Sequence, residues 1–363
     1  MHVSTTDEHG SVFICGFIFV QFMQTKIVGR IALAIALLSS LPAAALASAA
    51  GAGQDRLQEA ARLISEQKFG EAREILEALL ASAGEHALPE TYYQLTLCYL
   101  KQREWKKAEK TLQAFRRSSP ENVSGVYLEG YLLFSTGRYE ESLKVMEPLV
   151  ARNPEHAASH KVIGLDQFML ERMELAEAEL KRATVLAPED ADAHYYLGRI
   201  YFSRNNVPSA VAAFQRAAEL DASSVKTFNH LGQTYEALVQ YPAARAAYLR
   251  AIELEKQQAE KSEWPYFNLG ALCLKEGRAA EAVDYLQQAL SRHPAWSEGK
   301  AKLAMALVSL GRQPEALSLF EEAVRLDARN AEARYQYARL LTQMGKQDEA
   351  ERQLLLFEKQ QKP

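Results

Sequence analysis

Residues 191–224 read ADAHYYLGRIYFSRNNVPSAVAAFQRAAELDASS, and the rest of the chain is best interpreted from this stretch. Its Leu197-Gly198 pair belongs to a series. Glycines recur every 34 residues, and one more follows after four additional residues: Gly130, Gly164, Gly198, Gly232 and Gly270. A fixed period of this size indicates a stack of repeated supersecondary units, because one such unit cannot bury its apolar face alone.

Small residues recur in register with these glycines. Twelve residues after each glycine lies Ser142, Ala176, Ala210, Ala244 or Ala282. Seven residues further on lies Leu149, Ala183, Ala217, Ala251 or Ala289. Prolines mark the ends of four units, at Pro120, Pro154, Pro188 and Pro294. We interpret each unit as a helical hairpin whose helices cross closely, since a large side chain at the crossing would cost about 1–3 kcal/mol.

The pattern resembles the tetratricopeptide repeat, whose signature is present in Leu197-Gly198, Tyr201, Ala210, Phe214 and Ala217. The resemblance implies an all-α fold, a right-handed α-solenoid of about nine tetratricopeptide helical hairpins. The register places the repeats near residues 53–88, 89–122, 123–156, 157–190, 191–224, 225–258, 263–296, 297–330 and 331–363.

Glycine and proline also fall at fixed positions of this register. The fifteenth position holds Gly137, Gly277, Gly311 and Gly345, which predicts that each first helix ends there in the left-handed conformation. The eighteenth holds Pro208, Pro242 and Pro314, which predicts the first turn of the second helix. Pro148 lies inside a second helix and predicts a local kink.

Two segments depart from the period. The run from Leu254 to Glu263 adds four residues between the sixth and seventh repeats. Because four residues are about one helical turn, we expect a lengthened helix and a shifted repeat rather than a flexible linker. In the last repeat, Leu354–Phe357 is apolar, and we expect Leu355 or Leu356 to stay exposed as a contact through which the chain can form oligomers.

The N-terminal region has the order of a secretory signal peptide. Lys26 and Arg30 precede the apolar run of residues 31–38, and small residues follow it. Cleavage after Ala47 or after Ala49 fits this pattern equally well. We therefore expect the mature chain to be exported to the periplasm or the extracellular space.

The start of this signal has two interpretations. We interpret residues 23–49 as the signal peptide, with Met23 rather than Met1 as the start and residues 1–22 as a misannotated upstream extension. The alternative is a membrane anchor formed by the uncleaved N-terminal segment. Pro42 shortens its apolar core below the roughly 20 residues that a spanning helix needs, so cleavage is favoured.

Composition and motifs argue against catalysis and nucleic-acid binding. The 363 residues include 42 basic and 46 acidic ones, and the net charge of -4 provides no cationic field for a phosphate backbone. The repeats take up the chain from residue 53 onward, and no phosphate-binding loop, zinc-protease helix or nucleophile elbow occurs there. We predict that the protein is not an enzyme and has no catalytic residue, cofactor or metal site.

Cysteine and histidine residues are interpreted in the same way. Cys98 and Cys273 lie in apolar helical stretches five repeats apart, so we expect two buried thiols rather than a disulfide. His156 and His160 are four residues apart, as in a metal-binding pair, but no acidic or cysteine ligand has a matching spacing. We interpret them as ordinary solvent-facing histidines.

The resemblance to tetratricopeptide arrays implies a peptide-binding groove on the concave face, lined by first helices. The corresponding repeat positions hold the aromatic residues Tyr93, Tyr127, Tyr131, Phe134, Phe168, Tyr195, Tyr196 and Phe202. They also hold the cations and polar residues Lys161, Arg199, Lys226, Asn229, His230, Gln233 and Asn268. Rigid aromatics provide contact area at low entropy cost, and cations with amides can hold a carboxylate or backbone carbonyls.

The carboxylate clamp of the family is matched only in fragments, by Lys161, Lys226 and Asn268, and Leu165 stands where the clamp has asparagine.

The leading hypothesis is a non-catalytic interaction scaffold of the cell envelope that binds an extended peptide or a partner protein in its groove. The alternative is a structural subunit of a pilus, secretion or outer-membrane biogenesis machine that uses its convex face or its ends. A third is an accessory to a glycosyltransferase, for which a neighbouring protein must supply the active site. The expected partner is thus a protein or extended peptide, with no nucleic acid and no small-molecule cofactor, and the mature chain is not membrane-embedded.

Overall fold

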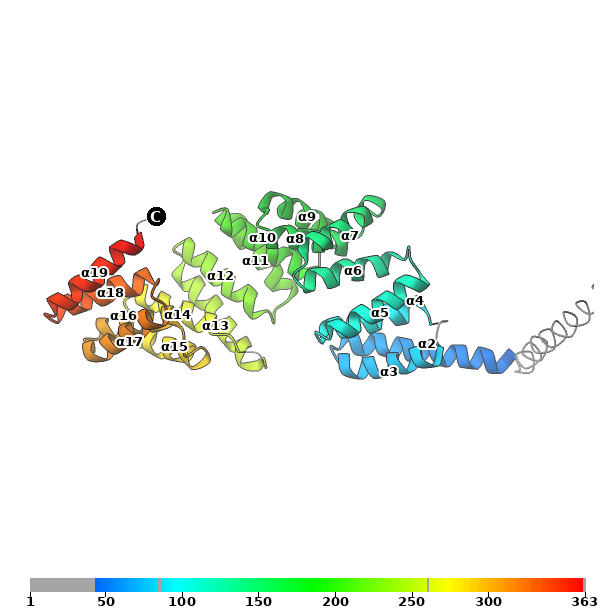
Figure 1. The fold of residues 1–363 in the computed structure, drawn as a ribbon, viewed down its shortest axis with the longest axis horizontal. Helices are drawn as coiled ribbons and strands as arrows, with labels where there is room; N and C mark the ends of the chain where they lie inside the picture. The colour runs from blue at the N-terminus through cyan, green and yellow to red at the C-terminus, as the bar shows by residue number, and fades with distance from the viewer. Residues whose placement is uncertain (1–42, 84–86, 260, 362–363) are drawn as a thin grey trace, which may run out of the picture. The chain divides into compact units, whose positions relative to one another are not determined.

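The computed structural model describes residues 43–83, 87–259 and 261–361, with side chains between residues 53 and 360. This part of the chain contains 18 helices and no strand, which confirms the predicted all-α fold of helical hairpins (Figure 1). The helices are α2 (Ala43–Ser65), α3 (Phe69–Ala83), α4 (Pro89–Lys101), α5 (Trp105–Ser118), α6 (Val123–Ser135), α7 (Tyr139–Arg152), α8 (Ala157–Met169), α9 (Met173–Leu186), α10 (Ala191–Ser203), α11 (Val207–Leu220), α12 (Val225–Ala237), α13 (Tyr241–Gln257), α14 (Trp264–Lys275), α15 (Ala279–Arg292), α16 (Ser297–Ser309), α17 (Gln313–Leu326), α18 (Ala331–Gln343) and α19 (Gln347–Gln361).

The turn between the two helices of a hairpin always contains one residue with positive φ. The predicted glycines adopt this conformation, with φ of 78° at Gly137, 73° at Gly277, 76° at Gly311 and 77° at Gly345. In five other turns the same position holds a residue with a β-carbon: Gln67, Arg103, Glu171, Asn205 and Val239, with φ between 56° and 61°. The hairpin therefore imposes the left-handed conformation whichever residue is present, and glycine meets it at the lowest cost.

The helices of a hairpin touch at the glycines of the 34-residue period. A β-carbon added to Gly198 would lie 2.7 Å from Phe214, and one added to Gly232 would lie 2.5 Å from Tyr248. Both distances are shorter than any normal carbon contact. The small residues of the second helices are fully buried opposite: Ala176, Ala210, Ala244 and Ala282. The predicted reason for the period, a close helix crossing, is confirmed.

The prolines lie where the register places them. Pro208, Pro242 and Pro314 fall within the first two residues of α11, α13 and α17, where a missing N–H leaves no hydrogen bond unmade. Pro148 lies inside α7, which continues past it to Arg152 as one helix.

The helices divide into two compact units, residues 1–132 and 133–363, with the boundary inside α6. In the described part of the first unit, the core contains the fully buried Leu76 and Phe115, and Tyr92 stacks on Phe115 with ring centres 5.8 Å apart. Helix α2 begins at Ala43, so it is longer at its N-terminal end than the predicted first repeat. The predicted signal segment up to residue 42 lies outside the described residues.

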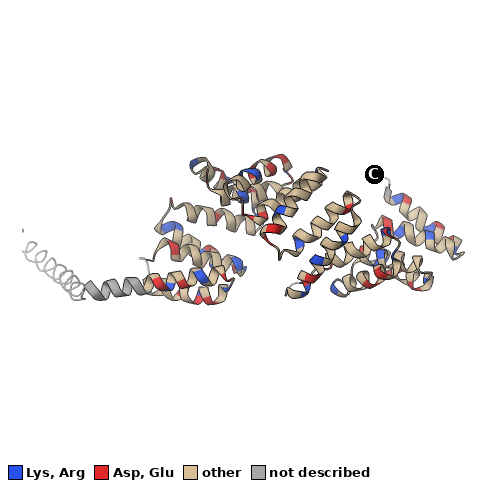
Figure 2. Cartoon of the chain, turned by 180° about the vertical axis from the view of Figure 1, so that it is seen from behind, with Lys and Arg blue, Asp and Glu red and all other residues tan. Residues whose placement is uncertain are grey.

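Among the described helices, none has the length and apolar character that crossing a lipid bilayer would require. Basic and acidic residues are interspersed along the described helices rather than gathered by sign (Figure 2). This distribution accords with the small net charge of -4.

The core of the second unit contains a buried carboxyl group where α8 meets α7. Asp166 on α8 and Ser142 on α7 are both fully buried. The residues 34 positions later in the period are Ile200 and Ala176, which are buried and apolar. Burial raises the pKa of Asp166 to about 7, and a hydrogen bond with Ser142 acts in the opposite direction. A carboxyl group therefore occupies a position that the other repeat fills with hydrocarbon.

The four additional residues lengthen a helix, as predicted. Helix α13 has 17 residues, whereas α11 and α15 have 14 each. Its last turn is held by the Glu255 carboxylate, which accepts hydrogen bonds from Arg292 at 3.0 and 3.1 Å and from the Tyr266 hydroxyl at 2.9 Å. Burial acts to raise the pKa of Glu255, but these hydrogen bonds and the charge of Arg292 lower it below its ordinary value. We call these three residues the buried brace.

Cys98 and Cys273 are free and buried, as predicted. The interpretation of the two histidines as solvent-facing is wrong for His160, which is 9% exposed. Its ring lies 2.6 Å from a Glu179 oxygen and donates to the Pro154 carbonyl at 3.0 Å. The His156 side chain is half-buried and accepts from the backbone N–H of Ser159, which caps the start of α8. Both rings serve local structure because the turn before α8 leaves polar groups that they can satisfy.

At the last hairpin, the expected apolar exposure is present. Leu355 and Leu356 on α19 are 55% and 43% exposed. Phe357 instead packs on Tyr335 of α18, with ring centres 5.5 Å apart.

Candidate functional site

Six of the predicted groove residues gather on α8, α10 and α12 in the second unit. The Phe168 and Tyr196 rings meet edge to face with centres 5.5 Å apart, and the Tyr195 and Tyr196 rings do so at 5.1 Å. The His230 ring lies edge to face against Tyr195 at 5.4 Å. We call this surface the aromatic strip, and its members are Phe168, Tyr195, Tyr196, Arg199, Lys226 and His230.

Two cations lie over the rings of the strip. The Arg199 guanidinium carbon is 4.6 Å from the centre of the Phe168 ring and 5.8 Å from that of Tyr196. The Lys226 ammonium nitrogen is 4.6 Å from the centre of Tyr195 and also 5.8 Å from that of Tyr196. Such contacts contribute about 0.5–1 kcal/mol each at exposed positions and hold the cation in place. Tyr196 is thus the ring on which both cations converge.

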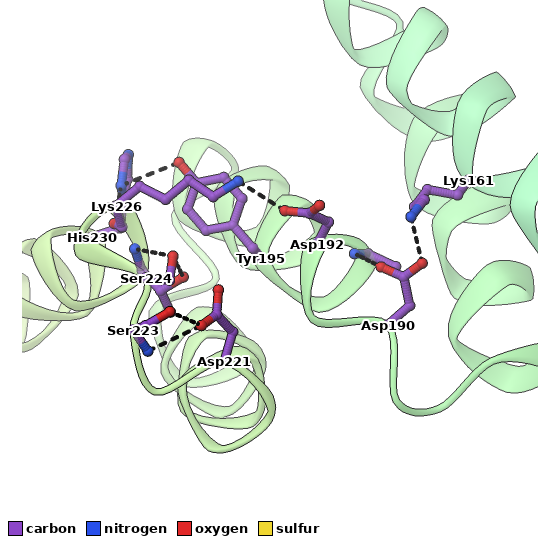
Figure 3. Close-up of polar contacts among 11 residues, drawn as sticks. Lys161, Asp190, Asp192, Tyr195, Asp221, Ser223, Ser224, Lys226 and His230 are labelled. Carbon is purple, nitrogen blue, oxygen red and sulfur yellow. Dashed lines mark hydrogen bonds and ion pairs between the residues drawn. The ribbon is translucent and has the colours of Figure 1, made fainter. Parts of the chain in front are cut away.

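The lysines of the predicted cationic patch are paired within the chain. Lys226 Nζ lies 2.8 Å from Asp192 Oδ1, and Lys161 Nζ lies 2.5 Å from Asp190 Oδ2 (Figure 3). Both predicted lysines are therefore paired within the chain, Lys226 with an aspartate of the preceding repeat and Lys161 with the N-cap residue of α10. Arg199 has no carboxylate partner among the described residues, so it is the cation of the strip that remains available for one.

Tyr195 and His230 are the members of the strip that contact each other beside Lys226. Tyr195 is 4% exposed, and burial raises its pKa to about 12. Its hydroxyl lies 3.5 Å from His230 Nδ1, and that nitrogen lies 2.9 Å from the Lys226 carbonyl oxygen (Figure 3). Burial lowers the pKa of His230, so the imidazole is neutral at pH 7. Phe202 packs half-buried near Tyr195 and belongs to the same core cluster.

The predicted amides form a buried pair that joins α12 to α14. Asn268 Nδ2 donates to Asn229 Oδ1 at 2.9 Å, and the two residues are 8% and 7% exposed. The Nδ2 group of Asn229 has no acceptor among the described residues. The Asn268 amide therefore donates across the contact between the helices, whereas the Nδ2 donors of Asn229 are not used in this contact. Gln233 follows Asn229 one turn later and is half-buried.

An open cleft of about 640 Å³ adjoins the strip at the four-residue insertion. We call it the insertion cleft. It is lined by the start of α12 and by the segment between α13 and α14, with the residues Asp221, Ser223, Ser224, Val225, Lys226, Asn229, His230, Gln233, Gln258, Lys261, Ser262, Trp264 and Pro265. Four predicted groove residues are among them, so the cleft and the strip share one surface.

Sequence reasoning missed the aromatic side of this cleft. Trp264 is 45% exposed and lines it. Behind it, the Trp296 ring lies 5.1 Å from Trp264 and 4.4 Å from Phe267 between ring centres. With the seventh repeat beginning at Glu263, Trp264 and Phe267 occupy the same repeat positions as Lys226 and Asn229. The shifted register therefore contained the signal for these two residues, whereas Trp296 is the last residue of that repeat.

The remaining predicted residues do not join the aromatic strip. In the first unit, Tyr127 and Tyr131 stack with ring centres 6.0 Å apart, and Tyr93 packs half-buried on the core, which raises its pKa. In the second unit, Phe134 contacts Tyr139 at 6.0 Å between ring centres. Within the described residues, no group of three or more histidine, cysteine or acidic side chains is arranged to hold a metal ion.

Comparisons with known proteins agree with the hairpin architecture. Sequence profiles described as Tetratricopeptide repeat match residues 93–157, 127–188, 162–225, 223–295 and 307–362. No curated protein sequence matches this chain.

Two solved structures share the fold at low identity. A chain of the APC/C hetero-tetramer Cut9-Hcn1 is 16% identical with a TM-score of 0.58, over 82% of this protein and 57% of that chain. The structure of pilF from Pseudomonas aeruginosa is 17% identical with a TM-score of 0.51, over 58% of this protein and 94% of that chain. This protein thus spans little more than half the length of the first of these chains. From the repeated profile matches and the hairpins that follow them, we conclude that the chain belongs to the tetratricopeptide repeat family.

Proposed function

We propose that this protein is a non-catalytic scaffold that binds an extended segment of a partner protein along the aromatic strip and into the insertion cleft. Tetratricopeptide repeats typically serve protein–protein interaction, which is the coarse basis of the proposal. The observation that carries it further is Arg199, held over Phe168 and Tyr196 without a carboxylate partner among the described residues. An arginine on an aromatic platform is a common anchor in protein interfaces.

The surface runs across several helices, which suits an extended chain. The strip crosses three successive first helices, α8, α10 and α12, and the cleft continues it to the start of α14. A peptide lying across it would place alternate side chains against rings that are already fixed by their neighbours. Little side-chain entropy is then lost on binding, which favours affinity.

The test compares variants of the strip with a matched variant outside it. Affinity capture of partners from a cell extract is measured for the wild type, Arg199→Ala, Tyr196→Ala and Lys275→Met. Lys275 also lies on a first helix and pairs with a carboxylate, Glu236, at 2.6 Å. We expect the strip variants to lose the captured partner and Lys275→Met to retain it, with equal melting temperatures. Unchanged capture by both strip variants would refute a role for the strip.

We further propose that the scaffold works in the cell envelope. The support is the sequence of residues 23–49, with its basic start, apolar run and small residues before Ala47 and Ala49. The test is fractionation of cells that produce the full chain, with mass spectrometry of its N-terminus. A new N-terminus directly after Ala47 or Ala49 in the envelope fraction supports export, and an intact chain confined to the cytoplasm contradicts it.

A second candidate is a structural subunit of an envelope assembly, and the exposed leucines of α19 favour it. Leu355 and Leu356 occupy solvent-facing positions of the last helix, where the preceding repeat has Glu321 and Glu322. A double change of these leucines to glutamate separates the candidates. Loss of a partner with this variant, and not with Arg199→Ala, supports binding through the end of the array.

A further inference from the structure

The outward face of α19, at the end of the second unit, carries exposed leucines (Figure 1). Leu355 is 55% exposed and Leu356 is 43% exposed. Leu354 is 36% exposed, whereas its equivalent on α17, Phe320, is 1% exposed and stacks on Tyr337 of the next hairpin. The described residues therefore leave uncovered on α19 an apolar surface of the kind that the next hairpin covers on α17.

Two rows of charged side chains flank Leu355 along this helix. Because the helix has about 3.6 residues per turn, Glu351 and Glu358 lie roughly 40–60° around it to one side of Leu355, and we call them the acidic row. Arg352 and Lys359 lie roughly 40–60° to the other side, and we call them the basic row. All four side chains are exposed, and none of them pairs with an opposite charge among the described residues.

Equivalent helices of earlier repeats lack this combination. On α17, Leu317 and Val324 occupy the positions of the acidic row and pack half-buried against the core. Glu321 stands there in place of Leu355. On α13, Leu249 occupies the position of Leu355 and is 41% exposed, but the four flanking positions hold only one acidic and one basic residue. An exposed leucine between two unpaired charged rows is therefore a feature of α19 and not of the repeat.

Rows of opposite charge on one helix are complementary to a second copy of the same helix. When two copies of α19 lie parallel about a twofold axis, Leu355 meets Leu355, and the basic row of each copy faces the acidic row of the other. Glu351 then lies beside Arg352 of the second copy. Glu358 lies beside Lys359 of the second copy, and each pair occurs twice. In an antiparallel arrangement, like rows would face each other.

Two features limit the strength of this contact. Asp348 lies near the same face, two turns before Leu355, and the partial positive charge of the helix start offsets only part of its charge. In addition, two single helices bury less than the roughly 1,200–2,000 Å² of a stable interface. We therefore expect a dissociation constant on the order of tens of micromolar.

Building on the second candidate function, we infer that the partner at this end of the array is a second copy of this protein, bound through two parallel α19 helices. The leucines form the centre of the contact, and the acidic and basic rows pair around them. Self-association is measured with the purified protein alone, so its failure is distinguishable from the failure of the candidate function.

Sedimentation equilibrium of the full chain measures the dissociation constant of the dimer. Leu355→Glu should raise this constant by about tenfold or more, because it places two like charges at the centre of the contact. Leu249→Glu changes an exposed leucine at the same repeat position of α13, and this matched control should leave the constant unchanged. The melting temperatures of the three proteins, measured below the dissociation constant by circular dichroism, should be equal.

Charge reversals test the pairing of the rows and its direction. Two double variants are compared, Arg352→Glu with Lys359→Glu, and Glu351→Lys with Glu358→Lys. Each alone should weaken the dimer by about tenfold, because like charges then face each other across the contact. An equimolar mixture should form heterodimers with a constant close to that of the wild type, which also shows that both variants are folded. Arg325→Glu, one period before Lys359 on α17, is the control and should have no effect.

The same measurements can overturn the inference. A wild-type chain that stays monomeric up to about 500 µM would do so, and so would an unchanged constant for Leu355→Glu. Charge variants that associate as tightly as the wild type, or a mixture that does not recover, would contradict the parallel pairing of the rows. If the wild type sediments as a monomer while Leu355→Glu with Leu356→Glu loses a captured partner, self-association is excluded and the second candidate function stands.

Discussion

The junction between α10 and α12 and the junction between α12 and α14 are built from the same repeat, yet they present different surfaces. At the first, Lys226 reaches Asp192, one period of 34 residues earlier in the chain, and rings fill the space between the helices. At the second, Asn268 reaches Asn229 across 39 residues, and a cleft of about 640 Å³ opens beside the contact. Four added residues have changed a filled junction into an open one.

The difference has a local physical cause. The additional residues lengthen α13 and place a polar segment between it and α14, so this segment rather than a neighbouring hairpin borders the start of α12. The two first helices still touch through their amides, so the stack is not interrupted. In a regular repeat, the neighbouring hairpin covers the polar groups and rings of the junction. At this single irregular unit, hydrogen-bond donors and one aromatic side chain remain uncovered.

The largest expected effect concerns the buried brace of the irregular junction. Arg292→Met leaves the Glu255 carboxylate, whose side chain is 1% exposed, without its cation. We expect the free energy of unfolding of the cooperative unit to fall by about 3–5 kcal/mol, because an uncompensated buried charge is costly. The measurement is chemical denaturation followed by circular dichroism. Arg250→Met is the control, since Arg250 and Glu253 form an exposed pair at 3.0 Å and should contribute less than about 1 kcal/mol.

The next effect tests the regular helix crossing. Ala244 is fully buried where α13 meets α12. Ala244→Trp should destabilise the protein by about 1–3 kcal/mol through overpacking. Leu249→Trp, on the same helix at a position that is 41% exposed, should be nearly neutral. A wild-type melting temperature for Ala244→Trp would contradict the assigned register.

A third prediction concerns the polar junction at Asp166. Burial raises its pKa in the folded protein to about 7, above the ordinary value of 3.8, so the folded state binds a proton that the unfolded state has released. Between about pH 4 and pH 7 stability therefore falls as pH rises, and above pH 7 the loss is complete. Asp166→Asn should stabilise the protein at pH 8 by on the order of 2 kcal/mol and have little effect near pH 4. Denaturation at both pH values measures this, and an equal effect at the two would exclude a titrating Asp166.

The smallest effect lies in the turn that precedes α13. Val239 has φ of 59° and is 67% exposed, so its β-branched side chain is strained and contributes little packing. Val239→Gly should raise the free energy of unfolding by about 1 kcal/mol. The reverse change at the equivalent turn, Gly277→Val, should lower it by a similar amount. If both changes were neutral, the turns would not require the left-handed conformation.

Most of the fold could be predicted because its causes are local and repeated. Gly198 and Ala210 directly indicate the close helix crossing, and Gly277 indicates the turn between the two helices of a hairpin. Their spacing recurs often enough to place the helices. The lengthened α13 followed from simple helix geometry, since four residues make about one turn.

The candidate site could be predicted only in part. Phe168, Tyr196 and Arg199 were placed on one surface because they occupy groove positions of two adjacent first helices, α8 and α10. Trp264 was not predicted, although it occupies the same repeat position in the shifted repeat as Lys226 does in the repeat before. The burial of His160 was missed since its partner Glu179 lies 19 residues away on the facing helix.

The sequence by itself determined the repeated hairpin, because close crossings and tight turns each demand particular small residues at short range. Only the tertiary structure decided which groove cations are neutralised and where the surface opens. Lys161 and Lys226 meet their aspartates 29 and 34 residues away, and the insertion cleft joins residues of α12 and α14 with residues of the connections before these helices. Such contacts depend on how far each hairpin is displaced from the next, and a shift of a few ångströms makes or breaks an ion pair.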